Sequence, residues 1–303
     1  MDIYLPIAGQ SVNALVIVVL GFLVGVLSGM FGVGGGFLTT PLLIFYGIPP
    51  TVAVASAATQ ITGASVSGVM VHMRRGGVDL KMGGVMIAGG LFGSFVGAGM
   101  FRALQSTGQI DVVIGLLYVL ILFWIGGLML FDGLRSLGYF KTAASEQGRP
   151  RHNRWVASLP LRWRFHGSGL YISPIAPFVL GFLAGTLTVF LGIGGGFILV
   201  PAMIYLLGMP ARIVIGTSLF MVLAVSAATT MVHAVTTRAV DVVLAALLLV
   251  GGVIGAQYGA LLALRVKPDM LRLALAVIIL LVGLRMFLGL FWHPDEIFSI
   301  EYL

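Results

Sequence analysis

Residues 21–37 read GFLVGVLSGMFGVGGGF, and residues 181–197 read GFLAGTLTVFLGIGGGF. Over residues 21–50 and 181–210, 13 of 30 positions are identical at a constant offset of 160. Each copy sets a run of glycines inside a very apolar segment, where one glycine costs a helix roughly 1 kcal/mol relative to alanine. Glycine breaks at matching positions of two halves indicate interrupted membrane helices, which form the binding site in many transporters.

The composition excludes a water-soluble globule. Of the 303 residues, 59% are apolar and 9% are charged, whereas a soluble domain carries roughly 25% charged residues. No Lys, Arg, Asp or Glu occurs in the 71 residues between Asp2 and Arg74. We therefore expect an all-α polytopic membrane protein. The absence of cysteine from the sequence excludes disulfides, thiol catalysis and thiolate metal sites.

Ten apolar segments form two sets of five. Most have the roughly 20 residues that a spanning helix needs, but 37–47 and 197–207, directly after the glycine runs, are shorter. We predict eight to ten membrane segments, the number depending on whether the short segments span or re-enter the membrane. The predicted division is a first repeat at 1–133, a linker at 134–173 and a second repeat at 174–303.

The duplication continues beyond the glycines. Asp79 and Asp241 lie at related places beside loops, and we interpret both as helix caps or loop residues. The linker carries seven Lys or Arg residues interleaved with Trp155, Trp163 and Phe165. This pattern favours a cytoplasmic linker with an interfacial segment that contacts membrane lipid over a segment that binds nucleic acid or a regulatory partner.

Lys and Arg residues predict the orientation. If the chain starts outside and each half makes five passes, one side receives 14 of these residues and the other only Arg102 and Arg238. This asymmetry predicts a cytoplasmic-membrane protein with both termini outside. An odd number of passes makes the two repeats inverted, and the number stays odd if each glycine hairpin re-enters without crossing. One crossing per hairpin would instead make the repeats parallel.

The glycine runs are the predicted substrate site. Glycine permits positive φ and exposes main-chain groups. The short helix after each run begins with unpaired N–H groups and the positive end of its dipole, which attract an anion. Inverted repeats would bring the two sites together near the midplane, whereas the alternative is helix packing through small residues. The candidate residues are Gly34, Gly35, Gly36, Gly194, Gly195 and Gly196.

Polar side chains in the next segments are further candidates, namely Thr59, Gln60, Thr217 and Ser218. Their hydroxyl and amide groups can donate hydrogen bonds to anion oxygens. The alternative is a structural role, in which a hydroxyl donates to the carbonyl one turn earlier and the amide has a protein partner.

Three ionisable residues are candidates for ion coupling. His72 and His233 suit proton coupling because histidine titrates near neutral pH, although their positions near segment ends favour solvated side chains. Inverted repeats would place them on opposite sides of the membrane, so we do not expect one shared site. Arg285 lies inside the last predicted span, where a charge marks a functional site unless its side chain extends to the surface.

These motifs resemble the TauE/SafE family of sulfite and organosulfur-anion permeases. The resemblance rests on the twin glycine runs, the following Pro41 and Pro201, the GTS element at 216–218 and the whole-chain duplication. It implies transport of small sulfur-containing anions, such as sulfite, sulfoacetate or other organosulfonates, and thiosulfate. It also assigns the hinge role to the glycine runs and a site role to the GTS element. The first half reads SAA at 56–58, so the two halves differ there.

We therefore expect a secondary transporter that works by alternating access, one repeat-derived bundle moving against the other. A passive anion channel with the same site is the alternative. An enzyme is not expected, because the predicted spans hold no Glu, no Cys and no His-x-Asp/Glu cluster, and no metal or cofactor is expected. The glycine-rich spans 83–99 and 251–259 leave open whether they pack within one chain or between copies in a homo-oligomer.

Overall fold

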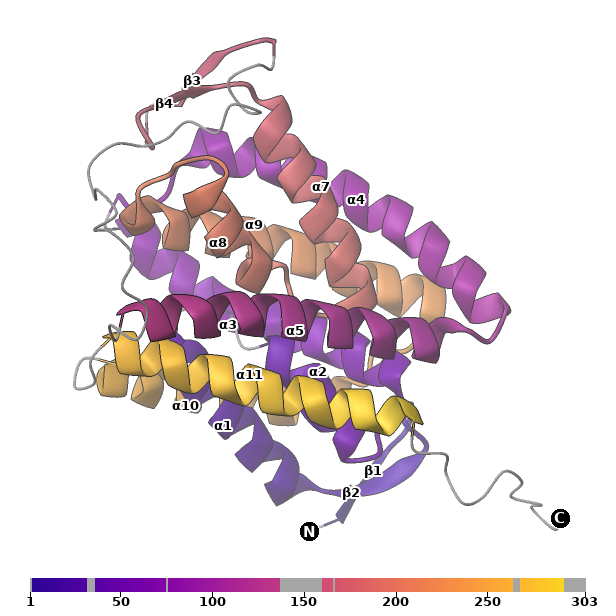
Figure 1. The fold of residues 1–303 in the computed structure, drawn as a ribbon. Coiled ribbons are helices and arrows are strands. Elements are labelled where there is room, and N and C mark those ends of the chain that lie inside the picture. The colour runs from indigo at the N-terminus through magenta and orange to yellow at the C-terminus, as the bar shows by residue number, and fades with distance from the viewer. Residues whose placement is uncertain are drawn as a thin grey trace, which may run out of the picture.

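The computed structural model describes residues 2–31, 36–74, 76–136, 160–165, 167–263 and 268–291, and most of them are helical (Figure 1). The first half contains β1 (Asp2–Leu5), β2 (Gln10–Asn13), α1 (Ala14–Phe31), α2 (Gly36–Phe45), α3 (Pro50–Arg74), α4 (Leu80–Ser106) and α5 (Ile110–Ser136). The second half contains β3 (Trp163–Phe165), β4 (Leu170–Ile172), α7 (Ile175–Leu191), α8 (Gly196–Tyr205), α9 (Ala211–Val232), a π-helical turn η1 (His233–Thr237), α10 (Val242–Ala263) and α11 (Pro268–Phe291).

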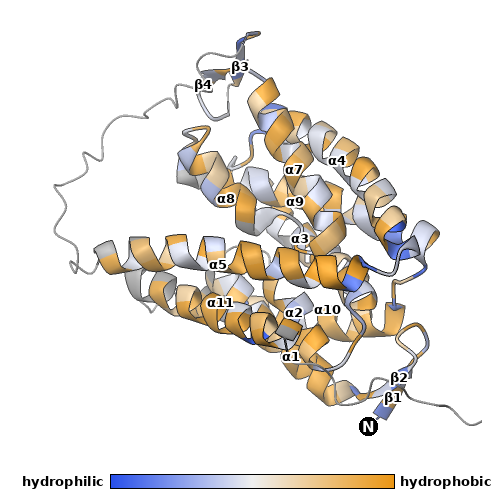
Figure 2. Ribbon diagram, turned by 45° about the vertical axis from the view of Figure 1, so that its right-hand side comes forward, coloured by the Kyte–Doolittle hydropathy of each residue, from blue (hydrophilic) through white to orange (hydrophobic). Residues whose placement is uncertain are grey.

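Among the described residues, six helices are long and apolar enough to cross a membrane, and they are α3, α4, α5, α9, α10 and α11. Most helical residues are apolar (Figure 2), and many large apolar side chains of these helices are exposed. Since no closed sheet accompanies these helices in the described part of the chain, the prediction of an all-α polytopic membrane protein is confirmed.

Each glycine break joins a long helix to a short helix that folds back towards the same end of the molecule. Leu5 of the β1–β2 hairpin packs with Leu43 near the end of α2 and with Val52 at the start of α3. The equivalent Phe165 of β3 packs with Met203 near the end of α8. A ten-residue helix is about 15 Å long, half of a hydrocarbon core of about 30 Å. This geometry is what re-entrant hairpins require, and whether the short helices span or re-enter the membrane stays a prediction.

Buried aspartates begin α4 and α10. The Asp79 carboxylate accepts hydrogen bonds from the backbone N–H of Met82 (3.0 Å) in its own helix and of Ser168 (2.8 Å) in the β3–β4 turn. The Asp241 carboxylate accepts one from the first turn of α10 (3.1 Å) and one from Ile7 (3.1 Å) in the β1–β2 turn. Both aspartates are therefore helix caps, which is one of the two predicted roles, and each also binds a β-hairpin of the other half.

A hydroxyl from the third helix of the other half completes each arrangement. The Asp79 N–H donates to Thr217 Oγ1 (3.0 Å), and the Asp241 N–H donates to Ser56 Oγ (3.3 Å). Ser56 and Thr217 are 161 positions apart in the sequence. Ile7 and Ser168, the hairpin residues that donate to the two aspartates, are separated by the same number of positions. The β3–β4 hairpin thus occupies the place of β1–β2, although it lies inside the predicted linker 134–173. The domain boundaries themselves stay a prediction.

Glycine faces bring two pairs of helices into backbone contact. A Cβ added to Gly25 of α1 would lie 2.3 Å from the carbonyl oxygen of Gly252 in α10. In the other half, a Cβ on Gly93 of α4 would lie 2.0 Å from the carbonyl oxygen of Phe182 in α7. No larger residue fits these contacts without displacing a backbone, so these glycines pack within one chain.

On the basis of these glycine contacts and of the aspartate hydrogen bonds, we divide the helices into two lobes, each of which includes one helix from the other half. Lobe A is defined as β1, β2, α1, α2, α3 and α10, and lobe B as β3, β4, α7, α8, α9 and α4. The helices α5 and α11 pack on each other as a separate pair. Along the chain, α3 and α9 occupy equivalent places, and they run antiparallel because Thr59 meets Thr230 whereas His72 meets Gly216. Inverted repeats require this antiparallel orientation of equivalent helices. Inversion of the whole repeat stays a prediction.

Replacing Asp79 with alanine is expected to lower the free energy of unfolding by about 3 kcal/mol. The variant loses a helix cap, worth about 1 kcal/mol, and the charged acceptor of the Ser168 hydrogen bonds, each worth about 1.5–3 kcal/mol. The matched control is Asp111→Ala, at an exposed position in the first turn of α5, which should cost less than about 1 kcal/mol. Thermal unfolding in detergent compares the two, and equal midpoints would contradict the anchoring role of Asp79.

Candidate anion site at the glycine hinges

The second glycine run is a turn that only glycine adopts easily. The helix α7 ends at Leu191, and the φ angles of Gly192, Gly194 and Gly195 are 64°, 70° and 72°. The left-handed conformation costs other residues roughly 1–2 kcal/mol each. The helix α8 then begins at Gly196, so its first N–H groups lie directly beside the turn.

In the first half, Gly34 and Gly35 lie outside the described residues, whereas Gly36 begins α2. A Cβ on Gly36 would lie 2.9 Å from the carbonyl oxygen of Gly192, so the two hinges meet. This close approach agrees with the expectation that the duplicated runs come together. Whether they bind a substrate there stays a prediction.

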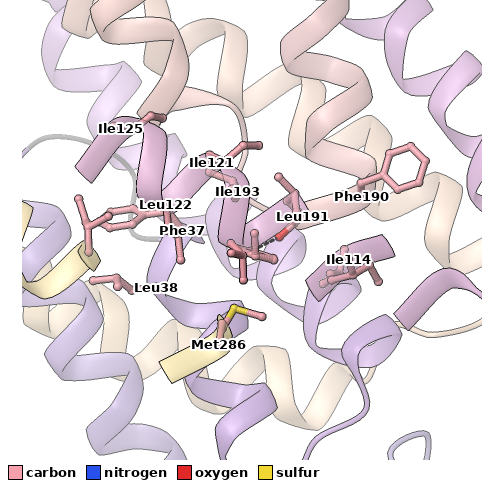
Figure 3. Packing of buried hydrophobic residues seen from close by; sticks show 14 of the residues in the cluster. Phe37, Leu38, Ile114, Ile121, Leu122, Ile125, Phe190, Leu191, Ile193 and Met286 are labelled. Carbon is pink, nitrogen blue, oxygen red and sulfur yellow. Dashed lines mark hydrogen bonds between the residues drawn. The ribbon is translucent and has the colours of Figure 1, made fainter. Parts of the chain in front are cut away.

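Hydrogen bonds and apolar side chains hold the meeting point. Thr40 Oγ1 of α2 donates to the carbonyl oxygen of Leu191 (3.1 Å), and the Tyr118 hydroxyl of α5 donates to the same oxygen. Figure 3 shows Leu191 and Ile193 among buried side chains of α2, α5, α7 and α11. The end of α7 is therefore tied to helices of the first half.

Two apolar residues fill the space between the hinges. A Cβ on Gly36 would lie 2.0 Å from Cδ1 of Ile61 in α3, and a Cβ on Gly194 would lie 2.9 Å from Cγ2 of Ile61. The Cβ on Gly194 would also lie 2.9 Å from Cγ1 of Val222 in α9. The centre is therefore closed by side chains of the two helices that connect the lobes.

Gln60, adjacent to Ile61, places an amide beside the first hinge. Its Oε1 accepts from Thr39 Oγ1 (3.1 Å) and its Nε2 donates to the carbonyl oxygen of Leu248 (3.4 Å). The side chain borders a cavity of about 30 Å³ that is also lined by Gly36 and by Ser28 of α1. Such a cavity holds about two water molecules, so this cavity, as the described residues line it, is too small for a bound oxyanion.

The seam between α3 and α9 carries hydroxyl groups, only one of which is a candidate from the sequence. Thr59 Oγ1 lies 3.4 Å from Thr230 Oγ1, and Thr62 Oγ1 lies 3.0 Å from Ser226 Oγ. Thr59 was a candidate, but the other three were not. A usable signal was the three-residue spacing of Ser56, Thr59 and Thr62, which places these hydroxyls on one side of a helix.

Thr217 and Ser218 do not join the hinges. Thr217 holds the backbone of Asp79, and Ser218 Oγ donates to the carbonyl oxygen of Ile215 (3.0 Å) in its own helix. Ser218 thus makes the bond within its own helix that was given as the alternative, whereas Thr217 has a different protein partner. A substrate contact by either residue stays a prediction. The hydroxyl equivalent to Thr217 is Ser56, so the two halves are more alike here than the GTS-to-SAA comparison indicates.

The three coupling candidates lie apart. His233 is fully buried, with Nε2 3.0 Å from the carbonyl oxygen of Val189 and Nδ1 3.3 Å from Thr237 Oγ1. The expectation of a solvated side chain at this position is therefore wrong. His72 lies half-buried at the opposite end of the α3–α9 pair, beside Gly216, so the two histidines form no common site.

Arg285 is exposed on α11, and its guanidinium lies 5.2 Å from the centre of the Phe45 ring. This position is that of a cation–π contact at the C-terminal end of α2, the end opposite to the glycine hinge. Within the described residues, no group of three or more His, Asp or Glu side chains could hold a metal ion.

The change Gly195→Ala should destabilise the hinge by about 1–2 kcal/mol, because alanine disfavours the left-handed conformation and its Cβ would lie 3.0 Å from Cβ of Ala184. Gly84→Ala is the control, since nothing lies within 4 Å of its Cβ position in α4 and alanine favours a helix by about 1 kcal/mol. We expect a lower thermal unfolding midpoint for Gly195→Ala and a higher midpoint for Gly84→Ala. A Gly195→Ala protein that is more stable than the parent would contradict the hinge geometry.

Comparison with known proteins agrees with this architecture. The family model described as Sulfite exporter TauE/SafE matches residues 17–286. Two proteins of Bacillus subtilis (strain 168), named probable membrane transporter proteins YjnA and YunE, are 30% and 27% identical to this chain. The alignments cover 89% and 88% of this chain and 98% and 95% of the relatives.

A probable membrane transporter protein of Xylella fastidiosa (strain Temecula1 / ATCC 700964) is 31% identical over 82% of this chain and 84% of its own length. No solved structure gives a significant match. Since the family model and these relatives align along most of its length, the chain belongs to the TauE/SafE sulfite exporter family of membrane transporters.

Proposed function

We propose that this protein is a secondary transporter of the cytoplasmic membrane, with both termini outside, which moves small sulfur-containing anions by alternating access. The substrate class comprises sulfite, sulfoacetate or another organosulfonate, and thiosulfate. The observation that carries the proposal is the meeting of the two hinges, where Gly36 and Gly192 are in contact and the short helices α2 and α8 begin.

The chemistry of this meeting point suits an oxyanion. The first-turn N–H groups of two short helices and their dipoles favour negative charge without a buried cation. The Gln60 amide and the Thr39 hydroxyl add neutral donors on one side. Anions with three oxygens can accept from several such donors at once. The family name supplies the sulfur-containing class, with sulfite as its named member.

The closed centre favours a transporter over a passive channel. Ile61 and Val222 fill the space between the hinges, and the adjoining cavity of about 30 Å³ is smaller than an oxyanion requires. A transporter needs such a closed state between its two open states, whereas a channel needs a continuous path. Proton coupling through His72 or His233, a contribution from Arg285, lipid contact by the linker and assembly into a homo-oligomer remain parts of the proposal.

Substitution of Gln60 by leucine should lower anion uptake by about tenfold or more. A hydrogen bond to a charged group contributes about 1.5–3 kcal/mol, and 1.4 kcal/mol corresponds to a factor of ten. Uptake of labelled sulfite, sulfoacetate and thiosulfate into proteoliposomes measures this effect. The matched control is Gln105→Leu at the exposed end of α4, which should transport like the parent.

Two results would count against the proposal. If a folded Gln60→Leu protein transports all three anions as fast as the parent, the hinges are not the anion-binding site. A flux that rises linearly with anion concentration, without saturation, would favour the passive channel.

A further inference from the structure

We propose that the anion crosses the membrane between lobe A and lobe B, along the seam between α3 and α9. This inference rests on the proposed transport function and names its route and its moving parts. It differs from the expectation that one sequence repeat moves against the other, because each lobe contains helices of both repeats.

The contacts inside each lobe oppose separation of the repeats. The α1–α10 and α4–α7 pairs touch backbone to backbone at their glycines, and each pair joins one helix from each repeat. Asp241 ties α10 to the β1–β2 hairpin and to Ser56, and Asp79 ties α4 to the β3–β4 hairpin and to Thr217. Moving one repeat away from the other would break all of these contacts, which lie in two close-packed interfaces.

The α3–α9 seam differs in its hydroxyls, three of which have acceptors in their own helices. Thr59 Oγ1 also donates to the carbonyl oxygen of Ala55 (3.0 Å) and Thr62 Oγ1 to that of Ala58 (2.9 Å). Ser226 Oγ donates to its own helix at 2.7 Å. Separation of the helices therefore leaves these three donors with acceptors in their own helices, so they avoid the penalty of about 1–3 kcal/mol for an unpaired group.

The seam also passes through the closed centre. Ile61 belongs to α3 and Val222 to α9, and both contact Gly194 of the second hinge. Movement of α3 away from α9 withdraws these two side chains from each other and opens the space between the hinges. The hydroxyls of Thr62 and Ser226 then line the opening and can turn from carbonyl oxygens to an anion. The ligand class is a small oxyanion that accepts several neutral hydrogen bonds.

The chain lacks native cysteine, so single-cysteine variants test the route directly. Thr62→Cys and Ser226→Cys report on the seam. The matched control is Thr186→Cys in α7, whose hydroxyl donates to the carbonyl oxygen of Gly93 in the α4–α7 contact (3.1 Å). A charged, membrane-impermeant methanethiosulfonate should modify both seam variants in proteoliposomes and leave the control unmodified. Modification of the control as fast as the seam, or inert seam cysteines, would overturn the proposal.

A cross-link supplies the second test. The hydroxyl oxygens of Thr62 and Ser226 are 3.0 Å apart, so the double variant Thr62→Cys/Ser226→Cys should form a disulfide that abolishes uptake until it is reduced. The control pair Gly63→Cys/Leu249→Cys joins α3 to α10 inside lobe A, where a Cβ on Gly63 would lie 2.4 Å from Cδ1 of Leu249. Its disulfide should leave uptake intact.

The two tests separate the route from the transport function. Uptake that continues across the seam disulfide, or that the control disulfide also stops, would overturn the proposed lobes. A parent protein that takes up none of the anions would refute the proposed function, and the thiol-labelling pattern would still decide the route by itself.

Discussion

Close contact between glycine backbones is the constraint on which this architecture depends. Inside a membrane, lipid is as apolar as leucine, so helices associate through close packing and polar contacts. The α1–α10 and α4–α7 pairs achieve this packing at glycines such as Gly25 and Gly93, where even one Cβ would strike the neighbouring backbone. These two contacts assign α10 to lobe A and α4 to lobe B, and they leave α3 and α9 as the main contact between the lobes.

Buried polar groups reinforce the same division. Asp79 and Asp241 are almost completely buried, and each is satisfied by its own helix, by a β-hairpin and by a hydroxyl of the other half. An unpaired charge at such a place would be very costly. The two hairpins lie at opposite ends of the molecule (Figure 1). Each end of the protein is therefore held by an equivalent polar anchor, while the centre is held by hinges and by the seam.

Much of the site follows from patterns that depend on local chemistry. Glycine runs in apolar segments predicted the hinges, because glycine adopts the positive φ angles found at Gly192, Gly194 and Gly195 more easily than any other residue. The related places of the two aspartates beside loops indicated helix caps or loop residues, and the structure shows that both are caps. The roles of Thr217 and Ser218 were not predictable in this way, since a hydroxyl in a helix looks the same whether its partner is a substrate, a carbonyl or a distant backbone N–H. His233 looked solvated because its place near a segment end says nothing about the neighbouring Val189 and Phe101.

The sequence by itself determined the membrane class, the two glycine-hinged halves and the family, because hydropathy, glycine content and duplication are properties of residues along the chain. Only the tertiary structure decided that the short helices fold back and that the hinges meet at Ile61 and Val222. It also decided that one helix of each half packs in the lobe formed mainly by the other half. Those outcomes depend on which helix faces complement each other. Periodic glycines mark a face that needs a close neighbour, but the neighbour is chosen by contacts between residues more than 200 positions apart, such as Gly25 and Gly252.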